Sequence, residues 1–300
     1  MTTDSPAHIS DATDVGAVPA GAGQPMLPPK AAGRSSKALS KVAGPLIGLA
    51  VFVGIWYFMH YWVLENVFDK PSFLITEPHR VIKDSFFDSV PREQMLTGLG
   101  WTTMIALIGL GISIVLGMTI AVLMAQSTLL EGAFWPYLIA AQAVPILAIV
   151  PILGSIFGFG YGSRVLVCVI ISIFPIVSNT LFGLLSAEKG MHDLFTLHRA
   201  SRTTRLFKLQ FPAALPAIFA GFRIAAGLSV IGAVVGELFF RRGSKGIGIL
   251  MDQYRSRNLY PLTYGALILS SLLGIAVFVF FGWLSKVAIG KWHETSRTGT

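Results

Sequence analysis

Charge and cysteine are scarce in this sequence. Asp, Glu, Lys and Arg make up only 13% of its 300 residues, whereas 53% are hydrophobic. Outside the apolar blocks there are only tails and loops of about thirty residues, too short to fold as a soluble catalytic domain. The single cysteine, Cys168, excludes an intrachain disulfide and a thiolate metal cluster, and we expect it to be buried in a helix. The composition predicts an integral membrane protein and argues against an enzyme that acts in water.

A phosphate-binding loop is also missing. No glycine-rich segment ends in Lys followed by Ser or Thr, so the chain has no usual cradle for a nucleotide. The net charge of +8 does not indicate nucleic-acid binding, because the basic residues lie beside apolar segments, where anionic lipid and membrane topology explain them. We therefore expect no metal, no bound cofactor and no nucleic-acid partner for this chain.

Six apolar segments are long enough to cross a membrane as helices, which need about 20 residues each. They lack the alternation of barrel strands, so we predict an all-α membrane protein with six transmembrane helices. Residues 1–40 are rich in small and polar residues and predict a disordered tail. Residues 41–94 hold the first helix and a loop, and residues 291–300 form a second tail. The six segments are approximately residues 44–64, 98–124, 133–157, 164–187, 213–238 and 261–288.

Basic residues before the first segment favour a cytoplasmic N-terminus. An even number of helices then places the C-terminus and the loop at 189–208 in the cytoplasm as well. The loop at 239–260 opposes this orientation, because its five basic residues would lie outside. The loop at 65–96 has six acids and four bases and suits the outer side. It predicts a helix near 77–90, with Thr76 as the N-cap and Pro78 in the first turn.

A basic, amphipathic stretch interrupts the apolar segments at residues 189–216. Residues 189–208 carry five Lys or Arg against one acid, Asp193. Apolar residues near helical spacing and basic residues at intervals of three indicate a helix at a membrane surface. One interpretation is a docking site for a soluble partner; the other is an interfacial helix held only by anionic headgroups.

Ionisable side chains at bilayer depth usually face a cavity or a partner, and Arg223 and Glu237 stand out here. We predict that the Arg223 side chain either lines a cavity, or extends to the membrane surface (snorkels) or binds backbone carbonyls. Glu237 predicts either a gate or ion-pair residue or a solvated helix end beside Arg241 and Arg242. A group of polar residues and a group of prolines inside the apolar segments indicate either a translocation pathway or ordinary helix packing and bending. They are Ser178, Asn179 and Thr180, and the prolines Pro145, Pro151 and Pro175.

Over residues 95–290 the chain resembles the permease subunits of bacterial ATP-binding cassette (ABC) importers of the nitrate, sulfonate and taurine type. The resemblance rests on an ordered set of segments rather than on one motif. They include WTTMIALIGLGISIVLGMTIAVLMAQS at 101–127, QAVPILAIVPILGSIFGFGYGSR at 142–164, FPIVSNTLFG at 174–183, FPAALPAIFAGFRIAAGLSVIGAVVGELFF at 211–240 and GIGILM at 246–251. The resemblance implies the type I (MetI-like) importer permease fold.

The same resemblance implies that residues 189–212 form two short helices that insert into a cleft on an ATPase. Counting back from Pro212 places Asp193 at the acid of the family's coupling motif and Arg199 at its glycine. Arg199 therefore implies an altered turn or a continuous helix. The implied coupling residues are Asp193, Leu194, Phe195, Arg199, Ala200, Arg205, Lys208, Leu209, Phe211 and Pro212.

Together these features predict the permease of an ATP-driven importer in the bacterial inner membrane. By resemblance it pairs with a second permease copy, two ATPase subunits that bind ATP and magnesium, and an external binding protein. The substrate implied is a small anion, such as nitrate, taurine or another sulfonate, or a vitamin precursor. The alternatives are a secondary transporter or channel driven by an ion gradient, which would need intramembrane acids and an inverted repeat, and a purely structural membrane subunit.

Overall fold

The computed structural model describes residues 34–69 and 71–290, which form helices and turns and no strand. Residues 52–290 belong to one compact unit, to which the contacts below refer. The predicted tails at 1–33 and 291–300 lie outside the described residues, and α1 begins inside the predicted 1–40 tail. The elements are α1 (Arg34–Phe58), η1 (Met59–Val63), α2 (Leu64–Asn66), η2 (Ser72–Leu74), α3 (Pro78–Ile82), η3 (Lys83–Phe87), α4 (Ser89–Gln126), α5 (Thr128–Ala143), α6 (Ile146–Phe157), α7 (Tyr161–Leu185), α8 (Lys189–Leu197), α9 (Arg202–Arg205), η4 (Leu206–Gln210), α10 (Phe211–Phe239), α11 (Ile247–Ser256) and α12 (Tyr260–Ile289).

Five of the described helices are long and apolar enough to cross a membrane, and a sixth crossing is counted if α5 and α6 form one broken span. This agrees with the predicted all-α membrane fold. The five helices are Ala43–Asn66, Ser89–Gln126, Tyr161–Leu185, Arg202–Phe239 and Tyr260–Ile289.

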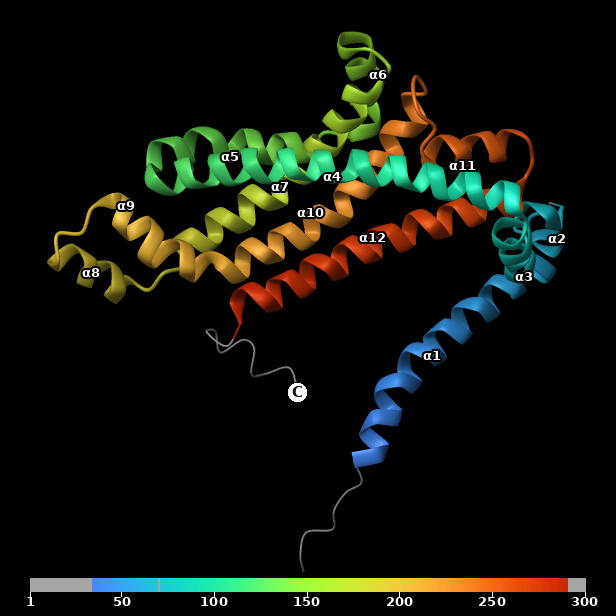
Figure 1. Cartoon of the computed structure of the whole chain (residues 1–300), viewed down its shortest axis with the longest axis horizontal. Coiled ribbons are helices and arrows are strands. Elements are labelled where there is room, and N and C mark those ends of the chain that lie inside the picture. The colour runs from blue at the N-terminus through green and yellow to red at the C-terminus, as the bar shows by residue number, and fades with distance from the viewer. Residues whose placement is uncertain (1–33, 70, 291–300) are drawn as a thin grey trace, which may run out of the picture. The chain divides into compact units, whose positions relative to one another are not determined.

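The predicted single helix at 133–157 is instead a pair of helices. α5 and α6 are bent by 100° relative to each other. Pro145 forms the N-cap of α6, and Val144 before it has the extended conformation (φ −72°, ψ 128°). The proline ring disfavours helical geometry in the residue that precedes it, so the chain breaks there despite its unbroken apolar character. In Figure 1, α6 projects away from the direction of α4 and α7.

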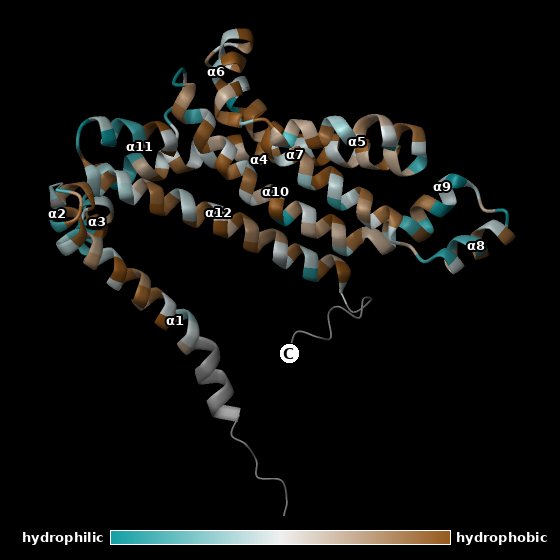
Figure 2. Ribbon diagram, turned by 180° about the vertical axis from the view of Figure 1, so that it is seen from behind, coloured by the Kyte–Doolittle hydropathy of each residue, from teal (hydrophilic) through white to brown (hydrophobic). Residues whose placement is uncertain are grey.

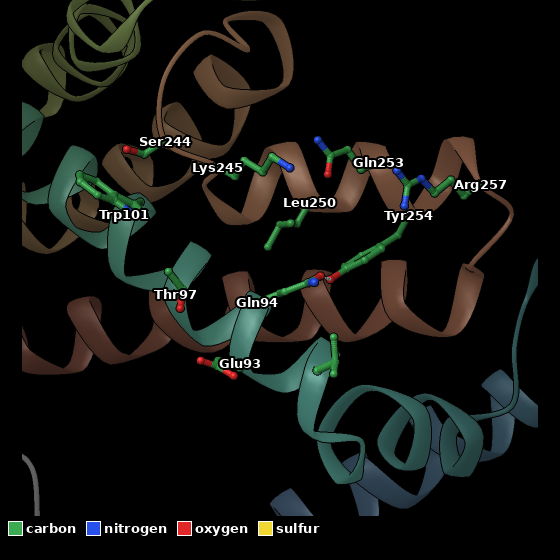
Figure 3. A pocket seen from close by; sticks show the side chains of 11 residues that line it. Glu93, Gln94, Thr97, Trp101, Ser244, Lys245, Leu250, Gln253, Tyr254 and Arg257 are labelled. Atoms are coloured by element: carbon green, nitrogen blue, oxygen red, sulfur yellow. Dashed lines mark hydrogen bonds between the residues drawn. The ribbon is translucent and has the colours of Figure 1, made fainter.

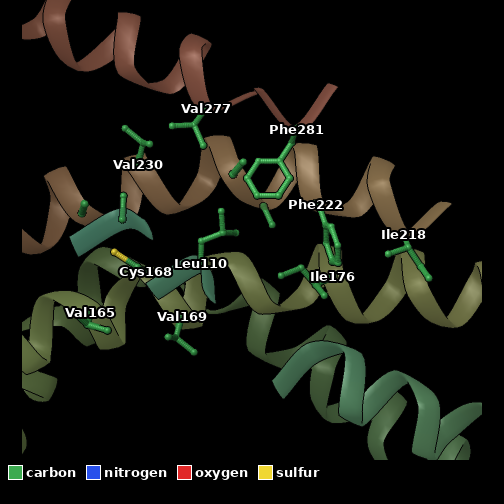
Figure 4. Packing of buried hydrophobic residues seen from close by; sticks show 14 of the residues in the cluster. Leu110, Val165, Cys168, Val169, Ile176, Ile218, Phe222, Val230, Val277 and Phe281 are labelled. Carbon is green, nitrogen blue, oxygen red and sulfur yellow. The ribbon is translucent and has the colours of Figure 1, made fainter. Parts of the chain in front are cut away.

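The core of the bundle surrounds α7, which packs against α4 and α10, while α12 packs against α10. Figure 4 shows Leu110, Cys168 and Ile176 facing Phe222, Val230 and Phe281 across these helices. Cys168 is fully buried, as predicted. Apolar packing therefore holds these four helices together.

The compact unit has two polar ends. Figure 2 shows hydrophilic residues concentrated on α8 and α9 at one end and on α11 at the other, with α10 and α12 mostly hydrophobic between them. We call the first the hairpin end and the second the α11 end. Figure 1 shows that the C-terminal end of α12 lies toward the hairpin end, and α3 toward the α11 end.

The segment before α4 differs from its prediction. Thr76 is not the N-cap; Glu77 occupies that position, and neither side chain caps the helix, because Thr76 Oγ1 donates to Phe73 O instead (3.4 Å). Pro78 lies in the first turn, as predicted. The helix leaves α geometry at Lys83, where η3 begins.

Candidate functional site

At the hairpin end, α8 extends beyond the packed helices. None of its residues is buried, although Met191, Leu194 and Leu197 are apolar, and Leu197 is 82% exposed. The predicted coupling residue Asp193 is exposed on the same helix. An apolar helix face that no other described residue covers is typical of a surface that binds a partner.

The turn between α8 and α9 is sharp and well ordered by hydrogen bonds. Arg199 has a left-handed conformation (φ 50°). Ala200 N donates to Phe195 O (2.9 Å) and Arg199 N donates to Thr196 O (2.9 Å), which together form a Schellman motif. The predicted alternative of a continuous helix is wrong, because the chain keeps the turn that glycine favours and accommodates an arginine in it.

Arg205 holds the hairpin together. Its Nη2 donates to Thr196 Oγ1 on α8 (2.8 Å), so at least part of the guanidinium faces the hairpin rather than a partner. Lys208 and Phe207 are exposed, whereas Leu209 is buried. Gln126 at the end of α4 donates to Gln210 (3.1 Å) and ties η4 to the bundle.

The π-helical η4 ends at Gln210, two residues before Pro212, whose ring nitrogen cannot donate a helical hydrogen bond. Phe211 packs against the core cluster. Of the predicted coupling residues, Leu209 and Phe211 thus face the bundle and anchor the hairpin to α10, while Asp193, Leu194 and Lys208 face outward.

Arg223 lies in a groove of about 720 Å³ between α10 and α12. Its Cζ atom lies 4.4 Å from the centre of the Phe278 ring. Its Nε has no hydrogen-bond partner among the described residues. Arg223 therefore lines a groove and lies over an aromatic ring, and its role in a translocation pathway stays a prediction.

Ser178 and Asn179 do not reach this groove. Both donate to Pro175 O on their own helix, at 3.4 and 2.8 Å, and Asn179 packs beside Gly221 of α10. Pro145 is the N-cap of α6 and Pro151 lies within α6, and neither lines the groove. The predicted pathway residues are thus not brought together with Arg223 at one site.

At the α11 end, Glu237 is fully buried, so the predicted solvated helix end is wrong. Its carboxylate accepts from Thr102 Oγ1 on α4 (2.9 Å) and from Gly248 N in the first turn of α11 (2.8 Å). A Cβ atom at Gly246 would collide with this carboxylate. The carboxyl group therefore lies at the N-terminus of α11, where a backbone N–H group donates to it.

Arg241 and Arg242, which sequence placed beside Glu237, have other contacts. Arg241 pairs with Asp252 of α11, which also binds Arg255 (2.9 Å). Arg242 N donates to Phe159 O (3.2 Å). Glu237 therefore forms no direct ion pair among the described residues.

Arg164, which is not among the site residues predicted from the sequence, is the second buried ionisable residue at the α11 end. It is 1% exposed. Its guanidinium donates to three carbonyl oxygens of the turn after α10: Phe240 (2.8 Å), Arg242 (2.7 Å) and Ser244 (2.8 Å). Arg164 and Glu237 thus fix the two sides of the segment that joins α10 to α11.

A pocket of about 550 Å³ lies between α4 and α11. Figure 3 shows Gln94 on α4 reaching toward Tyr254 of α11, while Trp101, Lys245 and Gln253 also line the pocket. Tyr254 Oη donates to Gln94 Oε1 (3.1 Å). Burial raises the pKa of the Tyr254 phenol, so it remains a hydrogen-bond donor at neutral pH. Among the described residues, no three His, Cys, Asp or Glu side chains form a metal site.

Comparisons with known proteins agree with this architecture. Residues 113–288 match the family model described as binding-protein-dependent transport system inner membrane component. The chain is 32% identical to the formylaminopyrimidine transport permease protein ThiX of Halalkalibacterium halodurans, over 79% of this chain and 92% of that protein. It is 27% identical to the nitrate import permease protein NrtB of a Synechocystis strain, over 83% and 90%.

Among solved structures, the chain is similar to a crystal structure of an amino acid ABC transporter with histidines. The TM-score is 0.51 at 14% identity, and the match covers 66% of this chain and 94% of that one. This similarity concerns the fold.

Proposed function

Because this chain belongs to the family of binding-protein-dependent transport system inner membrane components, we propose that it imports a small anion or a vitamin precursor. The chain is a multi-pass inner-membrane permease subunit of an ABC importer, and it is a transport component rather than an enzyme. Its relatives named for formylaminopyrimidine and nitrate transport support both substrate classes. Arg223, a cation in a membrane groove, favours the anion.

The observation that supports coupling to an ATPase is the uncovered face of α8. Leu194 and Leu197 are exposed there, and the Schellman turn and the Arg205–Thr196 hydrogen bond hold α8 at a fixed angle to α9. α9, η4 and α10 continue as one helix through Phe239, so a force on the hairpin reaches the membrane span directly. We assign the ATPase contact to this hairpin.

The proposed assembly contains two copies of this permease, two ATPase subunits that bind ATP and magnesium, and an external binding protein. The hairpin end then faces the cytoplasm, together with both termini, and the α11 end faces outward. ATP-driven closure of the ATPases moves the hairpins and shifts the bundle between inward-facing and outward-facing states. Glu237 and Arg164 hold the outer ends of the helices during this motion.

Co-purification tests the coupling proposal. The permease is expressed with the ATPase encoded beside its gene, as wild type and with Leu194→Asp and Leu197→Asp combined. Replacing apolar anchors at a protein interface costs about 2 kcal/mol or more, so we expect ATPase binding to weaken at least about tenfold. Leu129→Asp is the matched control, because Leu129 is 79% exposed at the start of α5.

Two results would contradict the proposed function. Uptake into vesicles without any ATPase would instead indicate a transporter driven by an ion gradient. An unchanged ATPase affinity in the double variant, with Leu129→Asp equally unaffected, would show that the hairpin does not contact the ATPase.

A further inference from the structure

The groove between α10 and α12 combines one cation with apolar walls. Among the described residues that line it, Arg223 is the only ionisable one. The remaining lining is mainly aliphatic and aromatic, with the hydroxyls of Ser270 and Ser271 already donating to Leu267 O (2.8 and 2.9 Å). The guanidinium is therefore the strongest hydrogen-bond donor available to a molecule in the groove.

Arg223 has no counter-charge in the part of the compact unit that the structure describes. None of the four ion pairs among the described residues includes it, and the residues around it are apolar. The ring of Phe278 covers one face of the guanidinium at 4.4 Å, and Gly282 leaves room for the guanidinium to lie against α12. A charge in a membrane span without a partner is costly, so an anion that reaches the groove gains a strong interaction.

Two glycines create the space next to this cation. A Cβ atom at Gly227 would meet nothing within 4 Å, and one at Gly274 would meet only Val230, at 4.0 Å. The groove holds about 720 Å³, which falls within the range of about 300 to 1,000 Å³ for drug-sized ligand sites. A bare oxyanion would leave most of this apolar surface uncovered.

We propose that this groove binds an organic anion whose acidic group contacts Arg223 and whose apolar body lies along Gly227, Gly274 and Ile275. The acidic group is a carboxylate or a sulfonate, because both match the planar guanidinium with two acceptor oxygens. This inference rests on the proposed function and narrows its substrate to anions with an apolar part. Nitrate could pair with the Arg223 guanidinium but has no apolar part to cover the apolar lining of the groove.

Binding to the purified importer complex tests the proposal. The complex is placed in nanodiscs of phosphatidylcholine, and the thermal midpoint of the permease is followed with butanesulfonate, nitrate and butanamide at equal concentrations. A ligand that binds only the folded state raises the midpoint. We expect butanesulfonate to raise it clearly, nitrate to act with at least about tenfold lower affinity, and butanamide to have no effect.

Variants locate the site. Arg223→Gln removes the charge and Gly274→Leu fills the open space, and each is expected to abolish the butanesulfonate shift. Arg223→Lys keeps a positive charge and is expected to retain part of it. Gly111→Leu on α4, where a Cβ also meets nothing within 4 Å, is the control and should respond like the wild type. A full response in Arg223→Gln and in Gly274→Leu would overturn the proposal.

Other occupants of the groove give different results. If an anionic lipid headgroup occupies it, phosphatidylglycerol in the nanodisc will shift the midpoint through Arg223 and compete with butanesulfonate. If a second permease copy covers it, Gly274→Leu will change the oligomeric state. Either result would overturn the proposal. The ATPase content of each sample distinguishes the failure of this inference from the failure of the proposed function. A complex that retains its ATPases but does not respond to butanesulfonate refutes only the anion site in the groove.

Discussion

Thr102 on α4 and Glu237 on α10 are joined by a buried hydrogen bond of 2.9 Å, and Thr102 Oγ1 also accepts from Ile247 N (2.8 Å). The threonine hydroxyl thus links the two groups, because it accepts from the first residue of α11 and donates to the Glu237 carboxyl group. Glu237 receives a second bond from Gly248 N. The consecutive helices α10 and α11 and the distant helix α4 therefore meet at one carboxyl group, which connects the elements of the α11 end.

Replacing Thr102 by Val should destabilise the protein by about 2 kcal/mol, because the N–H of Ile247 loses its acceptor and the buried carboxylate loses a donor. The thermal midpoint in detergent is expected to fall by several degrees. Thr103→Val is the matched control, since the Thr103 hydroxyl binds only Leu99 O of its own helix (2.7 Å). Thr102→Ser keeps the hydroxyl and should restore most of the loss. Equal midpoints for Thr102→Val and Thr103→Val would show that the junction contributes nothing.

The apolar segments were predictable because burial in lipid imposes a length and a composition on each span. The break at Pro145 was harder to predict, because prolines inside membrane helices are often tolerated, as Pro175 is within α7. Only the extended conformation of Val144 shows that the chain turns there.

Charges could be located from the sequence, but their partners could not. The charged residues nearest to Glu237 in sequence are arginines, whereas one of its two hydrogen-bond donors, Thr102, is 135 residues away. Arg164 is an ionisable residue in the first turn of an apolar segment, which is a signal that the sequence does contain. On sequence alone it is only the start of the predicted span at 164–187, so its bonds to the turn after α10 are not predicted. Nothing in the sequence places Phe278 beneath Arg223, since that contact depends on how α10 and α12 pack.

Replacing Arg164 by Lys should loosen the turn after α10. A guanidinium reaches three separate carbonyl oxygens with Nε, Nη1 and Nη2, whereas an ammonium is a single point and cannot span them. We expect faster amide hydrogen exchange over residues 240–246 and a loss of at least about 2 kcal/mol in stability. Arg242→Lys serves as the control, because the Arg242 side chain is exposed. Unchanged exchange in Arg164→Lys would refute the role assigned to the three bonds.

Replacing Arg199 by Gly should stabilise the hairpin by about 1 kcal/mol, because only glycine adopts the left-handed conformation without a steric cost. The measurement is hydrogen-exchange protection of the amides at residues 198–201. Arg202→Gly should instead lower the protection, because Arg202 begins α9 in right-handed geometry, where glycine loses more conformational entropy on folding. Lower protection in Arg199→Gly would show that the arginine side chain itself supports the turn.

Replacing Glu77 by Gln should reduce the sensitivity of the protein to acid. A hydrogen bond from the backbone N–H of Glu77 lowers the pKa of its carboxyl group. Burial opposes this effect, and the electrostatic contributions of His60, Arg80 and His79 add to it. A carboxyl group whose pKa is lowered in the folded state stabilises the protein above its unfolded pKa of about 4.3, and this contribution is lost as the pH falls through the folded value. The thermal midpoint of the wild type should therefore fall more steeply than that of Glu77→Gln between about pH 5 and pH 3. Glu65→Gln changes an exposed acid that forms no ion pair among the described residues, and it should follow the wild type. Parallel curves for all three proteins would mean that the Glu77 carboxylate adds no stability to the segment before α4.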